Sequence, residues 1–213
     1  MKCDKENLLL YAVTDRAWLG ESTLAHQVEE SILGGATMIQ LREKHLDSDA
    51  FLAEAREIKA LCKRHGVPFL VNDNVDIAVA MDADGVHVGQ HDMEAGAVRE
   101  KIGPDRILGV SAQTVEQALR AQAAGADYLG VGAVFPTGTK DDADAVSFDT
   151  LREICAAVTI PVVAIGGIGP GNLMQLAGSG VCGVAVVSAI YAQPDIRAAA
   201  RKLRALSQEM IAR

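Results

Sequence analysis

The sequence predicts an α/β protein with one domain, a closed (β/α)8 barrel (TIM barrel) that takes up residues 1–213. Strand-like and helix-like segments alternate along the chain, which is the pattern of a parallel sheet with right-handed crossovers. Apolar residues make up 49% of the composition and aromatic residues only 4%, as is typical of parallel sheets with aliphatic cores. There are eight strand-like segments, the number that closes a barrel. A doubly wound open sheet, which usually has fewer strands, is the alternative.

Each expected strand is a short apolar run that ends in turn-forming or polar residues. The strands are expected at residues 8–13, 38–41, 68–71, 85–88, 107–110, 128–134, 162–165 and 183–187. The helices are expected at residues 24–33, 51–62, 75–81, 115–124, 148–158 and 196–210. Ser22, Ser48 and Thr114 are the expected N-caps of three helices, and Gly35 and Gly66 lie at the ends of two. The sequence shows no linker or second core.

The charge balance excludes some classes of partner. A formal net charge of −8 and a pI near 5.1 argue against general binding to nucleic acid or membrane surfaces. An anionic small molecule would need local cations or a metal ion against that field. We therefore expect small-molecule substrates, with no nucleic acid and no membrane as partners, and the sequence leaves a homo-oligomer open.

The cysteines and the first residues indicate a cytoplasmic location. The four cysteines, at positions 3, 62, 155 and 182, form no CxxC pair and are interpreted as reduced thiols. The first sixteen residues contain acidic side chains and only a short apolar run, unlike a signal peptide. Residues 154–194 lack Asp, Glu, Lys and Arg, but glycine and proline divide them into runs too short to span a membrane.

Polar or glycine-rich residues follow nearly every expected strand at its C-terminal end. In a parallel barrel these ends meet at one rim, which is where the active sites of this fold lie. Strand ends are also polar simply because water reaches them. The N-terminal ends, such as residues 66–68 and 83–85, contain turn-forming residues and few groups capable of chemistry, which favours a functional rim.

The stretch from 128 to 140, YLGVGAVFPTGTK, joins a buried strand to a loop suited to anions. Pro136 ends the strand by removing a backbone donor. The residues after it are Thr137, Gly138, Thr139 and Lys140. Two hydroxyl groups, a glycine that lets an anion approach the backbone and a cation together suit phosphate. A plain surface loop of the same composition is the alternative.

The run QLREK, residues 40–44, places an amide, a guanidinium and an ammonium group at alternate positions. On a strand Gln40, Arg42 and Lys44 project to one side, and Leu41 and Glu43 face the other way. The first set suits a polyoxyanion, because arginine makes forked contacts and lysine supplies a mobile point charge. A helix cap or a solvated edge is the alternative.

Asp73 and Asp92 follow neighbouring strands, which places two carboxylates side by side at the rim. Near a phosphate they predict a Mg²⁺ site, since Mg²⁺ is often held by one or two carboxylates and completes its shell with phosphate and water. Ion pairs with Arg or Lys are the alternative. Asn72 offers an amide suited to the edge of a heterocycle. His87, in the middle of a strand, is interpreted as a packed core histidine.

Gly166-Gly167 and Val187-Ser188 follow the last two strands, where backbone N–H groups usually hold phosphate in this fold. No lysine or arginine lies between residues 154 and 194, so this site is neutral and separate from the cationic one at the QLREK run. Two anion sites of different kinds predict two phosphorylated substrates bound together.

These motifs, in their order along the chain, resemble the thiamine-phosphate synthase family. The stretches that carry the resemblance are QLREK (40–44), VND (71–73), GVHVGQHD (85–92), GVSA (109–112), GVGAVFPTGTK (130–140), AIGGI (164–168) and VVSAI (186–190). They span nearly the whole chain, and QLREK and FPTGTK are specific. His91 and Gln113 depart from the family pattern, which usually has an acidic residue at the first position and frequently a histidine at the second.

The resemblance implies a magnesium-dependent transferase. It would join 4-amino-2-methyl-5-hydroxymethylpyrimidine diphosphate to 4-methyl-5-hydroxyethylthiazole phosphate, giving thiamine monophosphate and pyrophosphate. The resemblance assigns Mg²⁺ to Asp73 and Asp92. The residues implied to bind the pyrimidine diphosphate are Gln40, Arg42, Lys44, Asn72, Ser111 and Lys140, with Leu41 and Glu43 of the same run also counted as substrate-binding. Those implied to bind the thiazole phosphate are Thr137, Gly138, Thr139, Gly167, Val187 and Ser188. The catalytic residues implied are Arg42, Lys44, Ser111 and Lys140.

The expected mechanism is a dissociative substitution without a protein nucleophile. Mg²⁺ and the cationic side chains would stabilise the charge that builds on the leaving pyrophosphate. The electron-rich aminopyrimidine can carry a transient cation, which the thiazole nitrogen attacks from close range. A thiazole tautomerase on the same barrel and a non-catalytic thiamine-phosphate sensor are the alternatives. The combined cationic and acidic residues favour the transferase, since an isomerase has no use for them.

Overall fold

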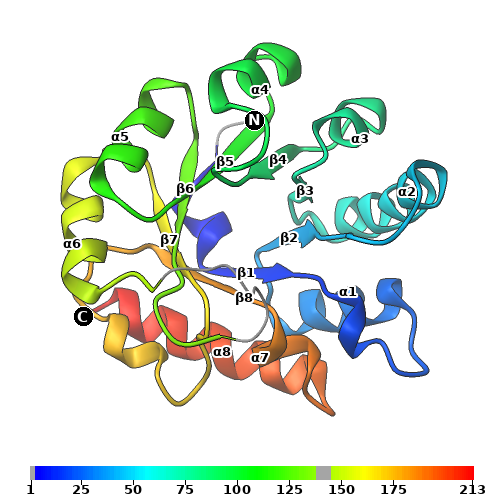
Figure 1. Ribbon diagram of the computed structural model, residues 1–213. Coiled ribbons are helices and arrows are strands. Elements are labelled where there is room, and N and C mark those ends of the chain that lie inside the picture. The colour runs from blue at the N-terminus through cyan, green and yellow to red at the C-terminus, as the bar shows by residue number, and fades with distance from the viewer. Residues whose placement is uncertain (1–2, 138–144) are drawn as a thin grey trace.

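Within residues 3–137 and 145–213, the part of the chain described by the computed structural model, eight parallel strands close into one barrel (Figure 1). Each strand pairs with the next, and β1 pairs with β8. The strands are β1 (Leu10–Val13), β2 (Met38–Leu41), β3 (Phe69–Asn72), β4 (Gly85–Val88), β5 (Ile107–Ala112), β6 (Tyr128–Val131), β7 (Val162–Ile165) and β8 (Gly183–Val186). The predicted (β/α)8 barrel is confirmed, and the β1–β8 pairing excludes an open sheet.

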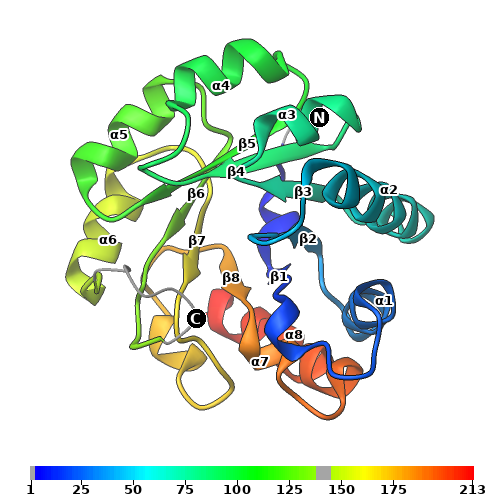
Figure 2. The same cartoon turned by 45° about the vertical axis from the view of Figure 1, so that its right-hand side comes forward.

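Helices surround the barrel on its outside (Figures 1 and 2). The α-helices are α1 (Leu24–Gly34), α2 (Ser48–His65), α3 (Val75–Ala80), α4 (Ala95–Ile102), α5 (Val115–Ala123), α6 (Phe148–Ala157), α7 (Ser188–Tyr191) and α8 (Ile196–Ile211). Shorter 3-10 turns are η1 (Lys5–Leu8), η2 (Arg16–Trp18) and η3 (Leu173–Leu176). The helix α1 packs against α8, so the first and last helices close the outer ring.

Two of the predicted N-caps are wrong. Thr23, not Ser22, caps α1 with its side chain, and Asp47, not Ser48, caps α2. In both places two residues capable of capping are adjacent, so composition alone does not choose between them. Thr114 caps α5 as predicted.

The first strand and one helix also differ from the prediction. Residues 5–8 form η1, so β1 begins only at Leu10. The helix α4, capped by the side chain of Glu94, was absent from the sequence-based series of elements. Its short run of mixed residues shows a weak apolar period, which explains why the pattern did not reveal it.

The core has two layers. Along β1, Leu10 and Ala12 belong to the layer between strands and helices, whereas Tyr11 and Val13 belong to the barrel interior, as the alternation of side chains along a strand requires. The interior cluster consists of Cys3, Leu8, Tyr11, Val13, Met38, Leu70, Ile107, Tyr128, Val163 and Ala185. The interior is therefore a packed core.

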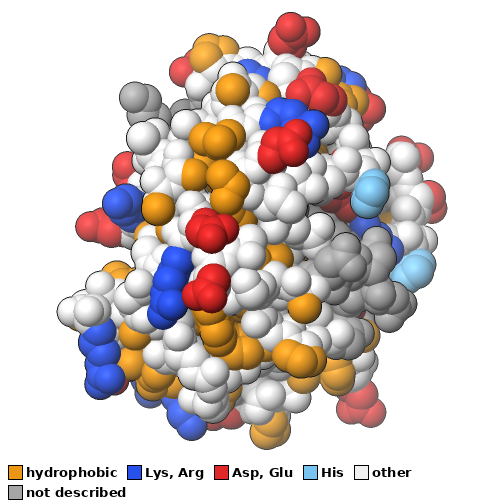
Figure 3. Space-filling model, turned by 60° about the vertical axis from the view of Figure 1, so that its left-hand side comes forward, with side chains coloured by type: hydrophobic (Ala, Val, Ile, Leu, Met, Phe, Trp, Pro, Cys, Tyr) orange, Lys and Arg blue, Asp and Glu red, His pale blue; other side chains and the backbone are white. Residues whose placement is uncertain are grey.

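The outer surface mixes charges of both signs. On the face shown in Figure 3, charged side chains interrupt the hydrophobic ones. Exposed ion pairs such as Glu116–Arg120 on α5, at 3.9 Å, add little stability because water screens them. Among the helices of the described residues, none is both long and apolar enough to cross a membrane.

Candidate active site

A cavity of about 210 Å³ lies at the C-terminal ends of the strands. Every strand of the described barrel contributes to its lining, either directly or through the loop that follows. This is the rim at which (β/α)8 barrels place their active sites.

Most of the predicted site residues whose positions are described line this cavity. They are Gln40, Arg42, Lys44, Asn72, Asp73, Ser111, Thr137, Gly167, Val187 and Ser188. Asp92 lies next to the lining residue Gly89, whose backbone N–H it accepts at 2.7 Å. The predicted phosphate-binding residues Gly138, Thr139 and Lys140 lie outside the described residues.

The alternation predicted for the QLREK run is confirmed. Gln40, Arg42 and Lys44 line the cavity, while Leu41 is fully buried in the layer between strands and helices. The Glu43 side chain is only 2% exposed and pairs with Arg16 outside the cavity. The side chains of Leu41 and Glu43 point away from the cavity. They are therefore not in a position to bind substrate, which differs from the prediction for these two residues.

The loop after β1 holds both the backbone and the side chain of Arg42. The backbone N–H of Arg42 donates to Oγ1 of Thr14 at 3.0 Å, and its guanidinium donates to Oδ2 of Asp15 at 3.2 Å. Asp15 in turn accepts the N–H of Ala17 at 2.9 Å, which fixes the carboxylate. The guanidinium is thus held at the rim before any anion binds, so less of its freedom is lost on binding.

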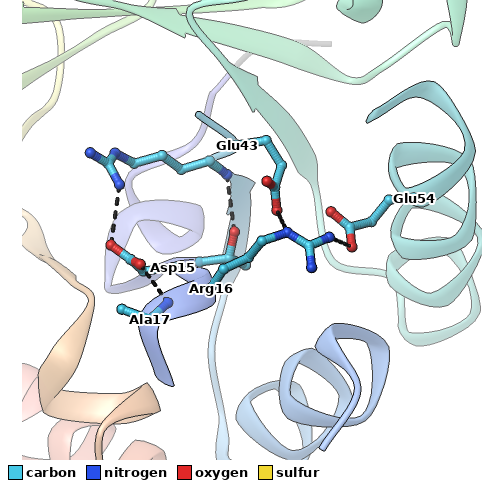
Figure 4. A network of polar contacts seen from close by, with 7 residues as sticks. Asp15, Arg16, Ala17, Glu43 and Glu54 are labelled. Carbon is cyan, nitrogen blue, oxygen red and sulfur yellow. Dashed lines mark hydrogen bonds and ion pairs between the residues drawn. The ribbon is translucent and has the colours of Figure 1, made fainter. Parts of the chain in front are cut away.

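On the opposite side of the same loop, Arg16 lies between two carboxylates (Figure 4). Its Nε is 2.7 Å from Oε1 of Glu43, and its Nη2 donates to Glu54 of α2. Burial and the nearby Glu43 carboxylate raise the pKa of Glu54 to about 7, although Arg16 opposes the shift. This cluster ties the loops after β1 and β2 to α2.

Asp73 occupies a backbone conformation that is uncommon outside glycine, with φ at 60°. Its backbone N–H donates to the carbonyl of His87 at 2.8 Å, which holds the conformation in place. The carboxylate accepts from Nζ of Lys44 at 2.8 Å. Burial by itself opposes ionisation, but the hydrogen bonds from Lys44 and Asp92 prevail and lower the pKa of Asp73.

Asp73 and Asp92 lie close enough for each carboxyl group to shift the pKa of the other. Burial, and the charge of Asp73, raise the pKa of Asp92, while the N–H of Gly89 acts in the opposite direction. Two carboxylates that repel one another fit a divalent cation, and hard oxygen ligands are what Mg²⁺ takes. No larger group of His, Cys, Asp or Glu suited to a metal is found in the described ranges, so the remaining ligands would come from substrate and water.

His87, interpreted from the sequence as a packed core histidine, is buried as expected and also lines the cavity. It is 9% exposed and lies on β4. Its Nε2 is 2.9 Å from Oγ of Ser111, and its Nδ1 is 2.8 Å from the hydroxyl of Tyr128. The alternation of side chains along β4 could have revealed that His87 faces the cavity, because His87 shares its face with Gly89, which lines the cavity.

The β7–β8 side of the cavity is made of small neutral residues. Gly166 and Gly167 adopt φ of 97° and 63°, and a Cβ at Gly167 would lie 2.4 Å from the carbonyl oxygen of Pro136. Asn172 braces the turn by donating to the carbonyl of Gly167 at 2.9 Å. Only glycine fits both the conformation and the close approach. This wall brings backbone next to the cavity without adding charge.

Together, the barrel and a cavity that combines carboxylates with cations at its C-terminal rim define a (β/α)8-barrel enzyme. A family model described as thiamine monophosphate synthase matches residues 10–190. The chain belongs to this family, the thiamine-phosphate synthases, and is a transferase.

Individual relatives agree with the family assignment. The chain is 49% identical over 200 residues to a thiamine-phosphate synthase of Clostridium tetani, with 94% of this chain and 96% of the relative covered. It is 52% identical over 199 residues to one of Ruminiclostridium cellulolyticum, with 93% and 95% covered. A solved thiamine phosphate pyrophosphorylase from Pyrococcus furiosus matches with a TM-score of 0.90 and 40% identity, covering 97% of this chain and 98% of that chain.

Proposed function

We propose that the protein joins 4-amino-2-methyl-5-hydroxymethylpyrimidine diphosphate to 4-methyl-5-hydroxyethylthiazole phosphate, releasing pyrophosphate and thiamine monophosphate. One observation carries the proposal: a single cavity has a cationic wall that includes Arg42 and Lys44 and a neutral glycine wall across the barrel at Gly166 and Gly167. The first suits a diphosphate and the second a monophosphate held by backbone N–H groups. The names of the relatives support the same product.

The cationic wall supplies the electrostatic part of the mechanism. Arg42, held by Asp15, offers its remaining N–H groups to the diphosphate, and Lys44 adds a second charge at the rim. Both stabilise charge that develops on the leaving pyrophosphate and cost little reorganisation because they are already in place. Mg²⁺ held by Asp73 and Asp92 would add Lewis-acid neutralisation of the same charge. Lys140, outside the described residues, is proposed to act with them.

Ser111 is better suited to binding than to nucleophilic attack. Its Oγ contacts His87, as in a nucleophile–base pair, but the other ring nitrogen of His87 contacts a phenol and not a carboxylate. Burial raises the pKa of Tyr128 far above its usual range, so this partner stays neutral and gives no charge stabilisation to an imidazolium. The pyrimidine therefore transfers directly to the thiazole nitrogen, as a transient cation, with no covalent enzyme intermediate.

The test is pyrophosphate release with both substrates, and with each one omitted in turn. Release is expected only when both are present, whereas a thiazole tautomerase would act without the pyrimidine diphosphate and a sensor would release none. Arg42→Ala is expected to lower turnover about 100-fold while the protein stays folded, because one preorganised cation is lost. Turnover within about two-fold of wild type in that variant would refute the assignment of the diphosphate to the cationic wall.

The magnesium assignment makes a separate prediction. Asp92→Asn is expected to raise the Mg²⁺ concentration needed for half-maximal activity by about ten-fold or more, since it removes one of two anionic ligands. The matched control is Asp105→Asn, which changes an exposed aspartate elsewhere on the barrel and should leave the titration unchanged. Identical Mg²⁺ titrations for wild type and Asp92→Asn would contradict the assignment.

We also propose a cytoplasmic location. All four cysteines, at positions 3, 62, 155 and 182, are free thiols, which a reducing compartment maintains. Labelling of thiols in freshly lysed cells would test this, and a disulfide recovered from the native protein would count against it.

A further inference from the structure

A continuous chain of polar side chains crosses the barrel interior at the floor of the cavity. Nε2 of Gln40 donates to the hydroxyl of Tyr11, which lies 2.9 Å from the hydroxyl of Tyr128. That hydroxyl is 2.8 Å from Nδ1 of His87, and Nε2 of His87 is 2.9 Å from Oγ of Ser111. The chain runs through β2, β1, β6, β4 and β5 in turn. Gln40, Tyr11, His87 and Ser111 line the cavity, whereas Tyr128 in the middle does not and is fully buried.

The chain has a direction because each phenol has a single proton. In the arrangement that gives every hydroxyl proton an acceptor, the hydroxyl of Tyr11 accepts from Gln40 and donates its own hydrogen bond to the hydroxyl of Tyr128. The hydroxyl of Tyr128 then donates a hydrogen bond to Nδ1 of His87. The imidazole proton is therefore on Nε2, which donates a hydrogen bond to Oγ of Ser111. The hydroxyl proton of Ser111 is then left for the cavity, and the carbonyl oxygen of Gln40 is the part of its amide that remains for a ligand.

Burial keeps this direction intact. Tyr11 and Tyr128 are 1% and 0% exposed, and burial raises the pKa of both phenols far above their usual range. Both therefore keep their protons under physiological conditions. Reversing the chain would require Gln40 to turn its amide and every proton to move at once, since a half-reversed chain leaves a buried polar atom unpaired.

The two ends present an acceptor at Gln40 and a donor at Ser111. An aminopyrimidine offers the complementary groups, an exocyclic N–H donor and a ring-nitrogen acceptor. In a 4-oxopyrimidine the same two positions carry a carbonyl acceptor and a ring N–H donor, so both contacts become repulsive. We propose that the Gln40–Tyr11–Tyr128–His87–Ser111 chain selects a 4-aminopyrimidine against its 4-oxo counterpart, with Tyr128 as a positioning residue that never touches the substrate. This inference rests on the proposed function.

Tyr128→Phe tests the proposal because it removes the central hydroxyl and keeps the ring. The measurement is the ratio of dissociation constants for the 4-amino and 4-oxo forms of 2-methyl-5-hydroxymethylpyrimidine diphosphate, with Mg²⁺ and without thiazole phosphate. Wild type is expected to favour the amino form by about 100-fold or more, as sites built around paired hydrogen bonds do. In Tyr128→Phe the two halves of the chain turn independently, and the preference should fall by about ten-fold or more.

Tyr191→Phe is the matched control. Tyr191 is also buried, and its hydroxyl lies 3.2 Å from Oγ of Ser31, away from the cavity. It should lose a similar amount of stability while its amino-to-oxo ratio stays that of wild type. If Tyr128→Phe does not fold, Tyr11→Phe breaks the same chain one residue earlier and must show the same fall in the ratio.

The outcomes separate this inference from the proposed function. If wild type releases pyrophosphate from both substrates but Tyr128→Phe and Tyr11→Phe keep its amino-to-oxo ratio, the inference is overturned and the proposed function stands. A reduced ratio in Tyr191→Phe would also overturn it, since the loss would then reflect general loosening. If wild type releases no pyrophosphate, the proposed function fails and the inference falls with it.

Discussion

At the scale of single residues, Asp15 shows how the cavity depends on side chains that need not touch a ligand. It accepts from the guanidinium of Arg42 at 3.2 Å and from the N–H of Ala17 at 2.9 Å. The second contact holds the carboxylate, and the first holds the cation. Arg42 is therefore positioned from the loop after β1, although it belongs to the loop after β2.

Asp15→Asn should weaken this positioning without unfolding the loop, because an amide oxygen can still accept from Ala17. We expect kcat/KM for the pyrimidine diphosphate to fall about five-fold, the size of a partly exposed ion pair near 1 kcal/mol, and KM for the thiazole phosphate to stay the same. Asp149→Asn is the control, since Asp149 pairs with Arg152 on the exposed surface of α6. Equal steady-state constants for Asp15→Asn and this control would contradict the role of Asp15.

Gly167 belongs to the neutral wall, and its backbone has φ of 63°. Gly167→Ala is expected to destabilise the protein by about 1–3 kcal/mol and to raise KM for the thiazole phosphate, because the new methyl group meets the carbonyl of Pro136 and the turn must shift. In Gly169→Ala the added Cβ meets nothing within 4 Å, so it serves as the control. The comparison is made by measuring thermal melts and KM values for both variants. A Gly167→Ala protein as stable as the Gly169→Ala control would exclude strain at this turn.

At the scale of elements, Glu54 connects α2 to the two loops that carry Asp15 and Glu43. Its pKa rises from 4.5 to about 7 on folding because of burial and the Glu43 carboxylate, so the folded protein holds this proton more tightly than the unfolded chain. Stability contributed by the protonated group is therefore present below the unfolded value and is lost as the pH rises through the interval up to about 7.

Glu54→Gln should remove that pH dependence. Relative to wild type, the Tm of the variant is expected to gain about 2–4 °C between pH 5 and pH 7, which corresponds to about 1 kcal/mol after allowance for the water that reaches the cluster. Glu57→Gln, at an exposed position of the same helix, is the control and should follow the wild-type curve. If the Glu54→Gln and wild-type curves run parallel across this interval, the cluster does not couple folding to pH.

Most elements could be predicted because their apolar periods are local. The strand β4 matches its predicted bounds, whereas the N-caps of α1 and α2 differ by one residue where two capping residues adjoin. Local patterning also predicted which members of the QLREK run face the cavity. It did not reveal that Glu43 would meet both Arg16 and Glu54, since those three residues come from separate elements that only folding brings together.

At the scale of the whole molecule, the contact between α1 and α8 accompanies the β1–β8 pairing that closes the barrel. Gly34 of α1 has no side chain, and a Cβ there would lie 2.5 Å from the carbonyl oxygen of Arg197. The guanidinium of Arg197 also forms two hydrogen bonds with Glu30, at 2.9 and 2.6 Å. Farther along α8, Ser207 donates to the carbonyl of Leu9 at 2.6 Å. The helix α8 is thereby hydrogen-bonded to the segment just before β1.

Gly34→Ala separates helix propensity from packing. In an isolated helix alanine is favoured by about 1 kcal/mol, but here overpacking against α8 should outweigh it and lower the Tm by about 3–10 °C in a single transition. Gly171→Ala, where the added Cβ meets nothing within 4 Å, is the control and should leave the Tm near that of wild type. A rise in Tm for Gly34→Ala would show that α1 and α8 are not in close contact.

The sequence by itself determined the barrel, its rim and the residue types gathered there, because strand alternation and the polarity of strand ends are read from neighbours along the chain. Only the tertiary structure decided how those residues are paired. Tyr11 and Tyr128 stand 117 positions apart and meet across the barrel, and His87 reaches Ser111 from a neighbouring strand. Such contacts follow from the closure and register of the strands, which are global properties that no local pattern contains.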